Sequence, residues 1–166
     1  MRTMLISFLK DVYERILSGE KIYEHRKVFP DGPVKAYVYV SAPMKSICGI
    51  MYLSNKTNLL EWREKYIDDE ETVKRIDEYL PRHNYAMEIN RFENTNAISL
   101  ERLRKDLSKF TVPQMYYFIE DSELLSYLEE NLIPDGIVVT HSYDNISSDM
   151  ICRGWEHMFR KNLTTD

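Results

Sequence analysis

Cysteines, glycine-rich loops and long apolar runs are scarce or missing in this 166-residue chain, and each absence removes a class of protein. The two cysteines, Cys48 and Cys152, lie far apart in no CxxC or Cys/His cluster, which argues against a structural zinc site. No glycine-rich phosphate loop or nucleophile elbow occurs, so NTPase and serine-hydrolase functions have little support. No apolar run approaches the ~20 residues of a membrane span, and the N-terminal MLISFL is shorter than a typical signal-peptide core. We expect a soluble, cytoplasmic protein with no metal, no cofactor and no membrane partner.

The charge of the chain is acidic overall but unevenly distributed. The net charge is −5, which argues against a large, nonspecific nucleic-acid footprint. Residues 1–45 hold 8 lysines and arginines against 5 aspartates and glutamates, a net +3 that leaves −8 for residues 46–166. This asymmetry favours recognition of a short segment or a single nucleotide over wrapping of a duplex.

Hydrophobic periodicity predicts an α+β domain. Leu9, Val12, Ile16 and Leu17 recur at helical spacing, and Gly19 stands where a left-handed residue ends a helix. Predicted strands cover residues 5–8, 21–29, 34–41, 46–53, 85–92 and 137–140, and predicted helices cover 10–18, 59–66, 68–80, 99–107, 122–132 and 154–162. Strands around an early helix, with further helices, predict a mixed sheet or small barrel. We expect one domain over 1–166, with a helical insertion at about 55–84 and a C-terminal extension at about 141–166.

Three charged residues follow the first predicted helix and stand among apolar and aromatic neighbours. In the stretch ILSGEKIYEHRK these are Lys21, Glu24 and Arg26. Because strand side chains alternate, Glu24 and Arg26 share a face and can form a surface ion pair worth under about 1 kcal/mol. The alternative is that they line a binding site. Spacing alone favours the ion pair.

The same stretch resembles the signature of the ASCH domain, a branch of the PUA-like fold, written G-x-K-x-x-E-x-R. Here the signature is filled by Gly19, Lys21, Glu24 and Arg26. GPVKAYVYVSAPMKSICGIM, YAMEINRF and SLERLRKDLSKFTVPQMYYFIED resemble later family segments, so the resemblance covers roughly residues 4–121. It implies a small mixed β-barrel with flanking and inserted helices, and a cleft lined by the signature residues. It also implies RNA or DNA binding, or, in some branches, ribonuclease or acetylcytidine amidohydrolase activity.

Each signature residue has a chemistry suited to a nucleotide. Arg26 supplies a planar fork for phosphate or a base edge, and Glu24 can orient that fork or accept from an exocyclic amine. Lys21 is a mobile cation that becomes nucleophilic when it is desolvated or placed near other positive charge. If the protein is an enzyme, Lys21, Glu24 and the more distant Glu88 are the candidate catalytic residues. The amidohydrolase branch, however, has threonine where this chain has Glu24, so the hydroxyl nucleophile is missing.

Four further residues are candidate ligand contacts. Tyr39 and Ser41, with Tyr37, form the second face of the predicted strand 34–41, where aromatic rings can stack on bases or pack under an insertion helix. Gln114 and Tyr116 follow Pro113 and can present an amide to a base or belong to a structural loop.

Three functions remain open from these residues. The first is a module that binds single-stranded RNA, a nucleotide, or an unpaired or modified base in the signature cleft, with Tyr39 stacking. The second is an enzyme of the ribonuclease or amidohydrolase type. The third is a regulatory protein that binds a protein partner through its acidic insertion, residues 61–80, although such a charge run is more often a solvated helical face. We prefer the first.

Overall fold

The computed structural model describes residues 1–153, and these form parts of two compact units. Unit 1 comprises Met1–Ile22, Gly32–Ser54 and Ile89–His141. Unit 2 comprises Tyr23–Asp31, Asn55–Glu88 and the segment that begins at Ser142. Each unit is described by itself. The helix expected at 154–162 lies outside the described residues.

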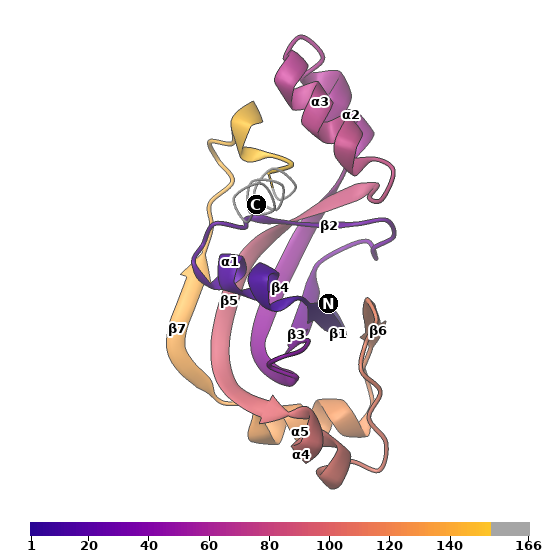
Figure 1. Ribbon diagram of the computed structural model, residues 1–166, viewed down its shortest axis with the longest axis vertical. Helices are drawn as coiled ribbons and strands as arrows, with labels where there is room; N and C mark the ends of the chain where they lie inside the picture. The colour runs from indigo at the N-terminus through magenta and orange to yellow at the C-terminus, as the bar shows by residue number, and fades with distance from the viewer. Residues whose placement is uncertain (154–166) are drawn as a thin grey trace, which may run out of the picture. The chain divides into compact units, whose positions relative to one another are not determined.

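Unit 1 holds most of the strands and three of the helices (Figure 1). Its elements are β1 (Arg2–Phe8), α1 (Lys10–Leu17), β3 (Val34–Val40), most of β4 (Ser46–Asn58), most of β5 (Tyr85–Ser99), α4 (Leu100–Asp106), β6 (Tyr116–Phe118), α5 (Glu123–Asn131) and β7 (Pro134–Thr140). Unit 2 holds β2 (Tyr23–Arg26), α2 (Leu59–Lys65), α3 (Glu70–Tyr79), a short 3-10 helix (Ser148–Met150) and the remaining parts of β4 and β5.

The sheet of unit 1 is mixed and curled. Its strand order is β7–β5–β4–β3–β1–β6, and the long strands β4, β5 and β7 are visibly curved (Figure 1). β1 and β3 run parallel, with Phe8 beside Val40, whereas β3–β4, β1–β6 and β5–β7 are antiparallel. The expectation of an α+β chain built on a mixed, barrel-like sheet with flanking helices is confirmed.

Capping residues set the helix boundaries. Asn58, Asp69, Ser99 and Ser122 each accept a hydrogen bond from a backbone N–H of the helix that follows. Gly19 has φ +82, as expected of a residue that ends a helix. The buried face of α1 differs from the expected one: Tyr13 and Ile16 are buried, whereas Leu9, which caps the helix in an extended conformation, is 59% exposed.

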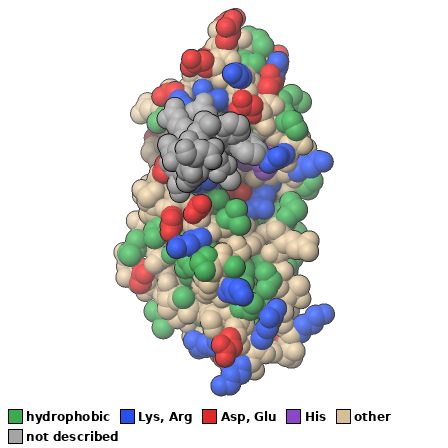
Figure 2. Space-filling model, in the orientation of Figure 1, with side chains coloured by type: hydrophobic (Ala, Val, Ile, Leu, Met, Phe, Trp, Pro, Cys, Tyr) green, Lys and Arg blue, Asp and Glu red, His purple; other side chains and the backbone are tan. Residues whose placement is uncertain are grey.

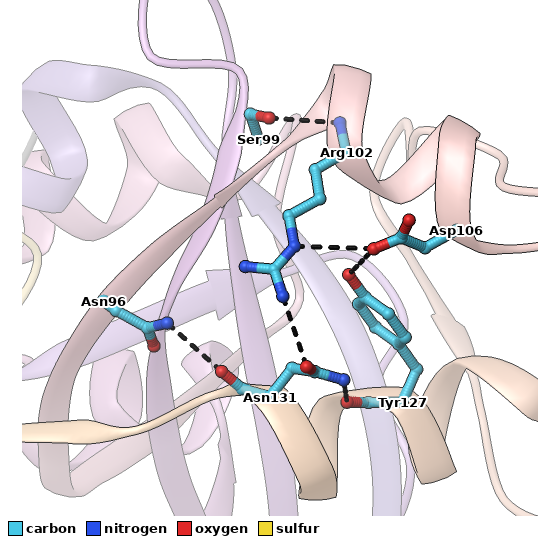
Figure 3. Close-up of polar contacts among 6 residues, drawn as sticks. All are labelled: Asn96, Ser99, Arg102, Asp106, Tyr127 and Asn131. Atoms are coloured by element: carbon cyan, nitrogen blue, oxygen red, sulfur yellow. Dashed lines mark hydrogen bonds and ion pairs between the residues drawn. The ribbon is translucent and has the colours of Figure 1, made fainter.

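α4 and α5 cover one face of β3. Arg102 on α4 donates to Asp106 (Nε–Oδ2 3.4 Å) and to Asn131 on α5 (Nη2–Oδ1 3.2 Å), and Tyr127 on α5 donates to Asp106 (2.7 Å), as Figure 3 shows. Asn96 on β5 donates to the Asn131 carbonyl oxygen (3.1 Å). These contacts hold the two helices together beside β5.

Of the two roles expected for the aromatic face of this strand, stacking on bases or packing under a helix, the second is observed. Tyr37 and Tyr39 are each 2% exposed and belong to an apolar cluster with Leu103, Leu107 and Leu128. The rings pack under α4 and α5, not under the insertion helices of residues 55–84. Tyr39 is too deeply buried to stack on a base in this conformation.

Gly49 on β4 is a site of close approach between neighbouring strands. A Cβ atom at this position would lie 2.4 Å from the ring of Phe92 on β5, a distance that side chains do not tolerate. The β3–β4 register also shifts next to Gly49: Val38 pairs with Gly49, whereas Tyr39 pairs with Ile47. Gly49 therefore stands at a bulge in β4 and packs directly against a ring of the neighbouring strand.

We expect Gly49→Ala to lower the free energy of unfolding by about 1–3 kcal/mol, because the added methyl group overpacks a rigid ring. Gly32→Ala is the matched control: nothing lies within 4 Å of its Cβ position, so its cost is limited to the positive φ of +82. Urea denaturation of both variants measures the difference. A loss at Gly49 below about 1 kcal/mol would contradict the close approach.

Candidate nucleotide-binding site

The centre of the candidate site is the ion pair between Glu24 and Arg26 on β2. Arg26 Nε donates to Glu24 Oε1 at 2.9 Å. The two side chains are only 6% (Glu24) and 12% (Arg26) exposed. The pair therefore forms as expected but is largely buried, unlike the surface ion pair that spacing alone favoured.

The backbone around Arg26 is held by one neighbouring segment, Asn84 and the start of β5. β2 pairs antiparallel with β5, with Glu24 opposite Met87 and Arg26 opposite Tyr85. The Asn84 backbone N–H donates a hydrogen bond to the Arg26 carbonyl (3.1 Å), and the Asn84 side-chain amide donates one to the Lys27 carbonyl (3.1 Å). The four-residue strand is thereby fixed to this segment both before and after Arg26 along the chain.

Tyr85 and Lys56 extend the site in unit 2, and sequence reasoning missed both. Tyr85 lies directly opposite Arg26, so their side chains share a face of the strand pair. Lys56 Nζ lies 4.5 Å from the centre of the Tyr85 ring. It also donates to the Phe29 carbonyl (2.9 Å) and pairs with Asp31 (2.6 Å), where it holds the pKa of the Asp31 carboxyl below its usual value. An aromatic ring and a second cation therefore lie on the Arg26 face.

Glu88 lies on the opposite face of the same strand pair. It stands opposite Tyr23, and adjacent residues of a strand point to opposite sides, so Glu24 and Glu88 do not face one another. Asn55 donates to Glu88 Oε2 at 2.6 Å. Burial, and then the charge of Glu88, raises the pKa of Tyr23 to about 12. The expectation that Glu24 and Glu88 act together as catalytic carboxylates is not supported by this geometry.

Lys21 belongs to unit 1, whereas Glu24 and Arg26 belong to unit 2. The Lys21 backbone N–H donates to the Arg15 carbonyl (3.0 Å), which continues the turn at Gly19 that ends α1. The next residue, Ile22, accepts from the Ile89 N–H on β5 (3.0 Å). Lys21 is thus held close to the end of α1 and to β5.

Ser41, Gln114 and Tyr116 gather at one edge of the unit 1 sheet. β1 and β3 run parallel, so their carboxyl ends meet there, and Ser41 bonds the Phe8 carbonyl through its N–H (3.0 Å) and its Oγ (3.3 Å). Tyr116 pairs with Ile6 on the other side of β1, and Gln114 just before it is exposed. Tyr39 precedes Ser41 by two residues but points into the buried cluster under α4 and α5.

Among residues 1–153, no three His, Cys, Asp or Glu side chains are placed to share a metal ion. No helix in this part of the chain is long and apolar enough to cross a membrane.

Comparison of this chain with solved structures identifies its fold. The ASCH protein of Zymomonas mobilis superposes with a TM-score of 0.60 at 19% identity, covering 80% of this chain and 97% of that one. A serine-to-alanine mutant of that protein gives a TM-score of 0.57 at 18% identity, covering 78% and 96%. A tyrosine-to-phenylalanine mutant gives 0.56 at 17%, covering 80% and 99%. The chain has an ASCH-like fold.

The likeness is one of fold, because identity stays below a fifth of the residues. No protein-family profile matches the sequence, and no curated protein does. Glu24 and Arg26, which resemble the last two residues of the ASCH signature, meet as a largely buried pair within this ASCH-like fold. A guanidinium fixed through its Nε has a defined plane, which is what bidentate recognition of phosphate or a base edge requires.

We expect Glu24→Gln to lower the free energy of unfolding by about 3 kcal/mol, because it removes the charged partner of a largely buried guanidinium. Glu93→Gln is the matched control, since Arg91 and Glu93 form the same i, i+2 pair on β5 (2.7 Å) with Arg91 47% exposed. Its loss should stay under about 1 kcal/mol. Equal losses in urea denaturation would show that the Glu24–Arg26 pair behaves as an exposed one.

Proposed function

We propose that this protein is a binding module for single-stranded RNA and that it recognises an unpaired or modified base. The observation that carries the proposal is the largely buried Glu24–Arg26 pair at the ASCH signature, with Tyr85 and Lys56 on the same strand face. Glu24 orients the Arg26 fork toward a phosphate or a base edge. Tyr85 takes the stacking role that sequence reasoning gave to Tyr39.

The remaining signature and edge residues have supporting roles in this proposal. Lys21, in unit 1, is a cation for a phosphate of the RNA. Gln114 and Tyr116 present an amide and a phenol to a base, and Ser41 contributes a hydroxyl group at the same edge of the sheet. The net charge of −5 agrees with contacts to a few phosphates only.

An enzymatic function is the less favoured alternative. The chain carries Glu24 where the amidohydrolase branch of the ASCH family has threonine, and Glu88 projects to the other side of the β2–β5 pair. Lys21 would then lack the carboxylate pair that the enzymatic hypothesis assigned to it. These observations support binding over catalysis.

A role for the acidic insertion in binding a protein stays a prediction. Within residues 61–80, Asp77 pairs with Arg63 (2.7 Å), and Asp69 caps α3 and accepts from Ser148 (2.8 Å). Part of this charge therefore holds unit 2 together and is not available to a partner.

We expect Arg26→Ala to weaken binding to a single-stranded RNA octamer at least tenfold, because the variant loses the bidentate contact. Arg26→Lys should be almost as weak, since an ammonium group cannot reproduce the planar fork. Arg91→Ala, from the exposed pair with the same spacing, is the control and should bind normally. Fluorescence anisotropy at several salt concentrations measures the affinities, and circular dichroism checks folding. Unchanged affinity of folded Arg26→Ala for the best ligand would contradict the proposal.

A further inference from the structure

The strand β7 of unit 1 is apolar in its second half, yet it is exposed. Every residue of β7 except the partly buried Val139 is exposed. Ile137 is 50% and Val138 is 42% exposed, although adjacent residues of a strand point to opposite faces. Neither face of the strand is therefore well covered at this point. Figure 2 shows exposed hydrophobic side chains along the side of unit 1 where Figure 1 draws β7.

β7 also lies at an open edge of the sheet. Among residues 1–153 it pairs with β5 and with no other strand. The His141 N–H donates to the Asn90 carbonyl of β5 (3.2 Å). Because the backbone groups of successive strand residues point to alternate sides, Val138 and Thr140 direct their N–H and C=O groups away from β5. The outer edge thus presents donors and acceptors to a further strand.

The features that protect an edge strand from pairing occur only in the first half of β7. Pro134 lacks an N–H, and the β5–β7 register shifts within this half. Asp135 adds a charge there, and its Oδ1 accepts a hydrogen bond from the Ile137 N–H (3.0 Å). The second half, residues 137–140 (IVVT), has no proline and no charge, and all of its side chains are β-branched. Such residues favour strands and pack well on one another.

We propose that this second half of β7 pairs with the same segment of a second copy of the chain, antiparallel and about a two-fold axis. A strand is complementary to itself in this arrangement, because every contact is made twice. With Val138 opposite Thr140 of the second copy, the two strands exchange about four backbone hydrogen bonds. The exposed surfaces of Ile137 and Val138 are partly covered at the same time. A contact of this size belongs to the weak, transient associations.

The charges on β5 favour this register over the neighbouring one. Glu93 lies beside Val138, and Arg91 beside Thr140, on one face of the strand pair. In the proposed register each row across the joined sheet has Glu93 at one end and Arg91 at the other, about 14 Å apart. With Val138 opposite Val138, two Glu93 carboxylates would share a row. That register would also place Thr140 opposite Gly136, where a φ of +92 interrupts the extended backbone.

The strand at the other end of the sheet, β6, is a poorer partner for β7. It has three residues, and short edge strands resist pairing. Pairing of β7 with β6 of another copy would be head-to-tail and would let chains add without limit, whereas the two-fold pairing closes after two copies. The inference does not depend on the proposed function, because β7 contains none of the residues assigned to RNA.

Analytical ultracentrifugation of the full chain over the micromolar range measures the association. The average mass should rise with concentration from 19.8 kDa toward twice that value. Val138→Lys should weaken the association at least about tenfold, because it places a charge in the middle of the edge. Ile133→Lys is the matched control and should change it less than about twofold, since this side chain is 64% exposed but precedes β7.

Amide hydrogen exchange shows whether the contact is made by this edge. The Val139 and His141 N–H groups point to β5 and should be protected at every concentration. The Val138 and Thr140 N–H groups should exchange fast at low concentration and become protected as the dimer forms. This readout uses the unchanged chain, so it decides even if Val138→Lys fails to fold.

Three outcomes would overturn the inference. The first is a chain that stays monomeric over the whole range. The second is a dimer in which the Val138 and Thr140 amides still exchange fast and which folded Val138→Lys leaves intact, because the contact would then use another surface. The third is growth in mass beyond the dimer, which would show a head-to-tail contact in place of the two-fold one.

Discussion

A carboxylate with 6% of its surface exposed needs a compensating charge, and in this protein the charge comes from the same strand. Taking Glu24 and Arg26 out of water costs several kcal/mol for each ion, and their attraction offsets that cost only with good geometry. An apolar pair of similar volume would stabilise β2 at least as well. Stability alone therefore does not explain why the chain carries this pair. A ligand that needs an oriented guanidinium explains it directly.

The surrounding structure serves to hold this guanidinium still. β2 contributes only four residues, so its position depends on β5 and on the two bonds from Asn84. The same pairing brings Tyr85, and with it Lys56, to the Arg26 face. A single register thus determines both the orientation of the arginine and the identity of its aromatic neighbour. It also sends Glu88 to the other face, which separates the two carboxylates.

The sequence predicted the helices and strands well, because a helix cap, a turn glycine or strand alternation depends on neighbouring residues in the chain. Gly19 ends α1 through its positive φ, and Asn58 and Ser99 cap the helices that follow them. The alternation in β2 correctly put Glu24 on the same side as Arg26.

The errors concern contacts between segments far apart in the chain. Alternation showed that Tyr39 and Ser41 share one face of β3. It could not show that Tyr39 is buried by α4 and α5, which begin at Leu100 and Glu123, far along the chain. Tyr85 was visible within a predicted strand, yet its place beside Arg26 depends on the β2–β5 register, which no local pattern sets. The burial of the Glu24–Arg26 pair was missed for the same reason.

The central claim is that the Arg26 guanidinium, oriented by Glu24, contacts the RNA. Nitrogen-15 NMR of the arginine side chains tests it most directly. In the free protein the Arg26 Nε–H should exchange slowly with solvent, because it is hydrogen-bonded and largely buried. Addition of single-stranded RNA should then shift this resonance in step with saturation. An Arg26 resonance that stays unchanged at saturation, while other signals report binding, would contradict the claim.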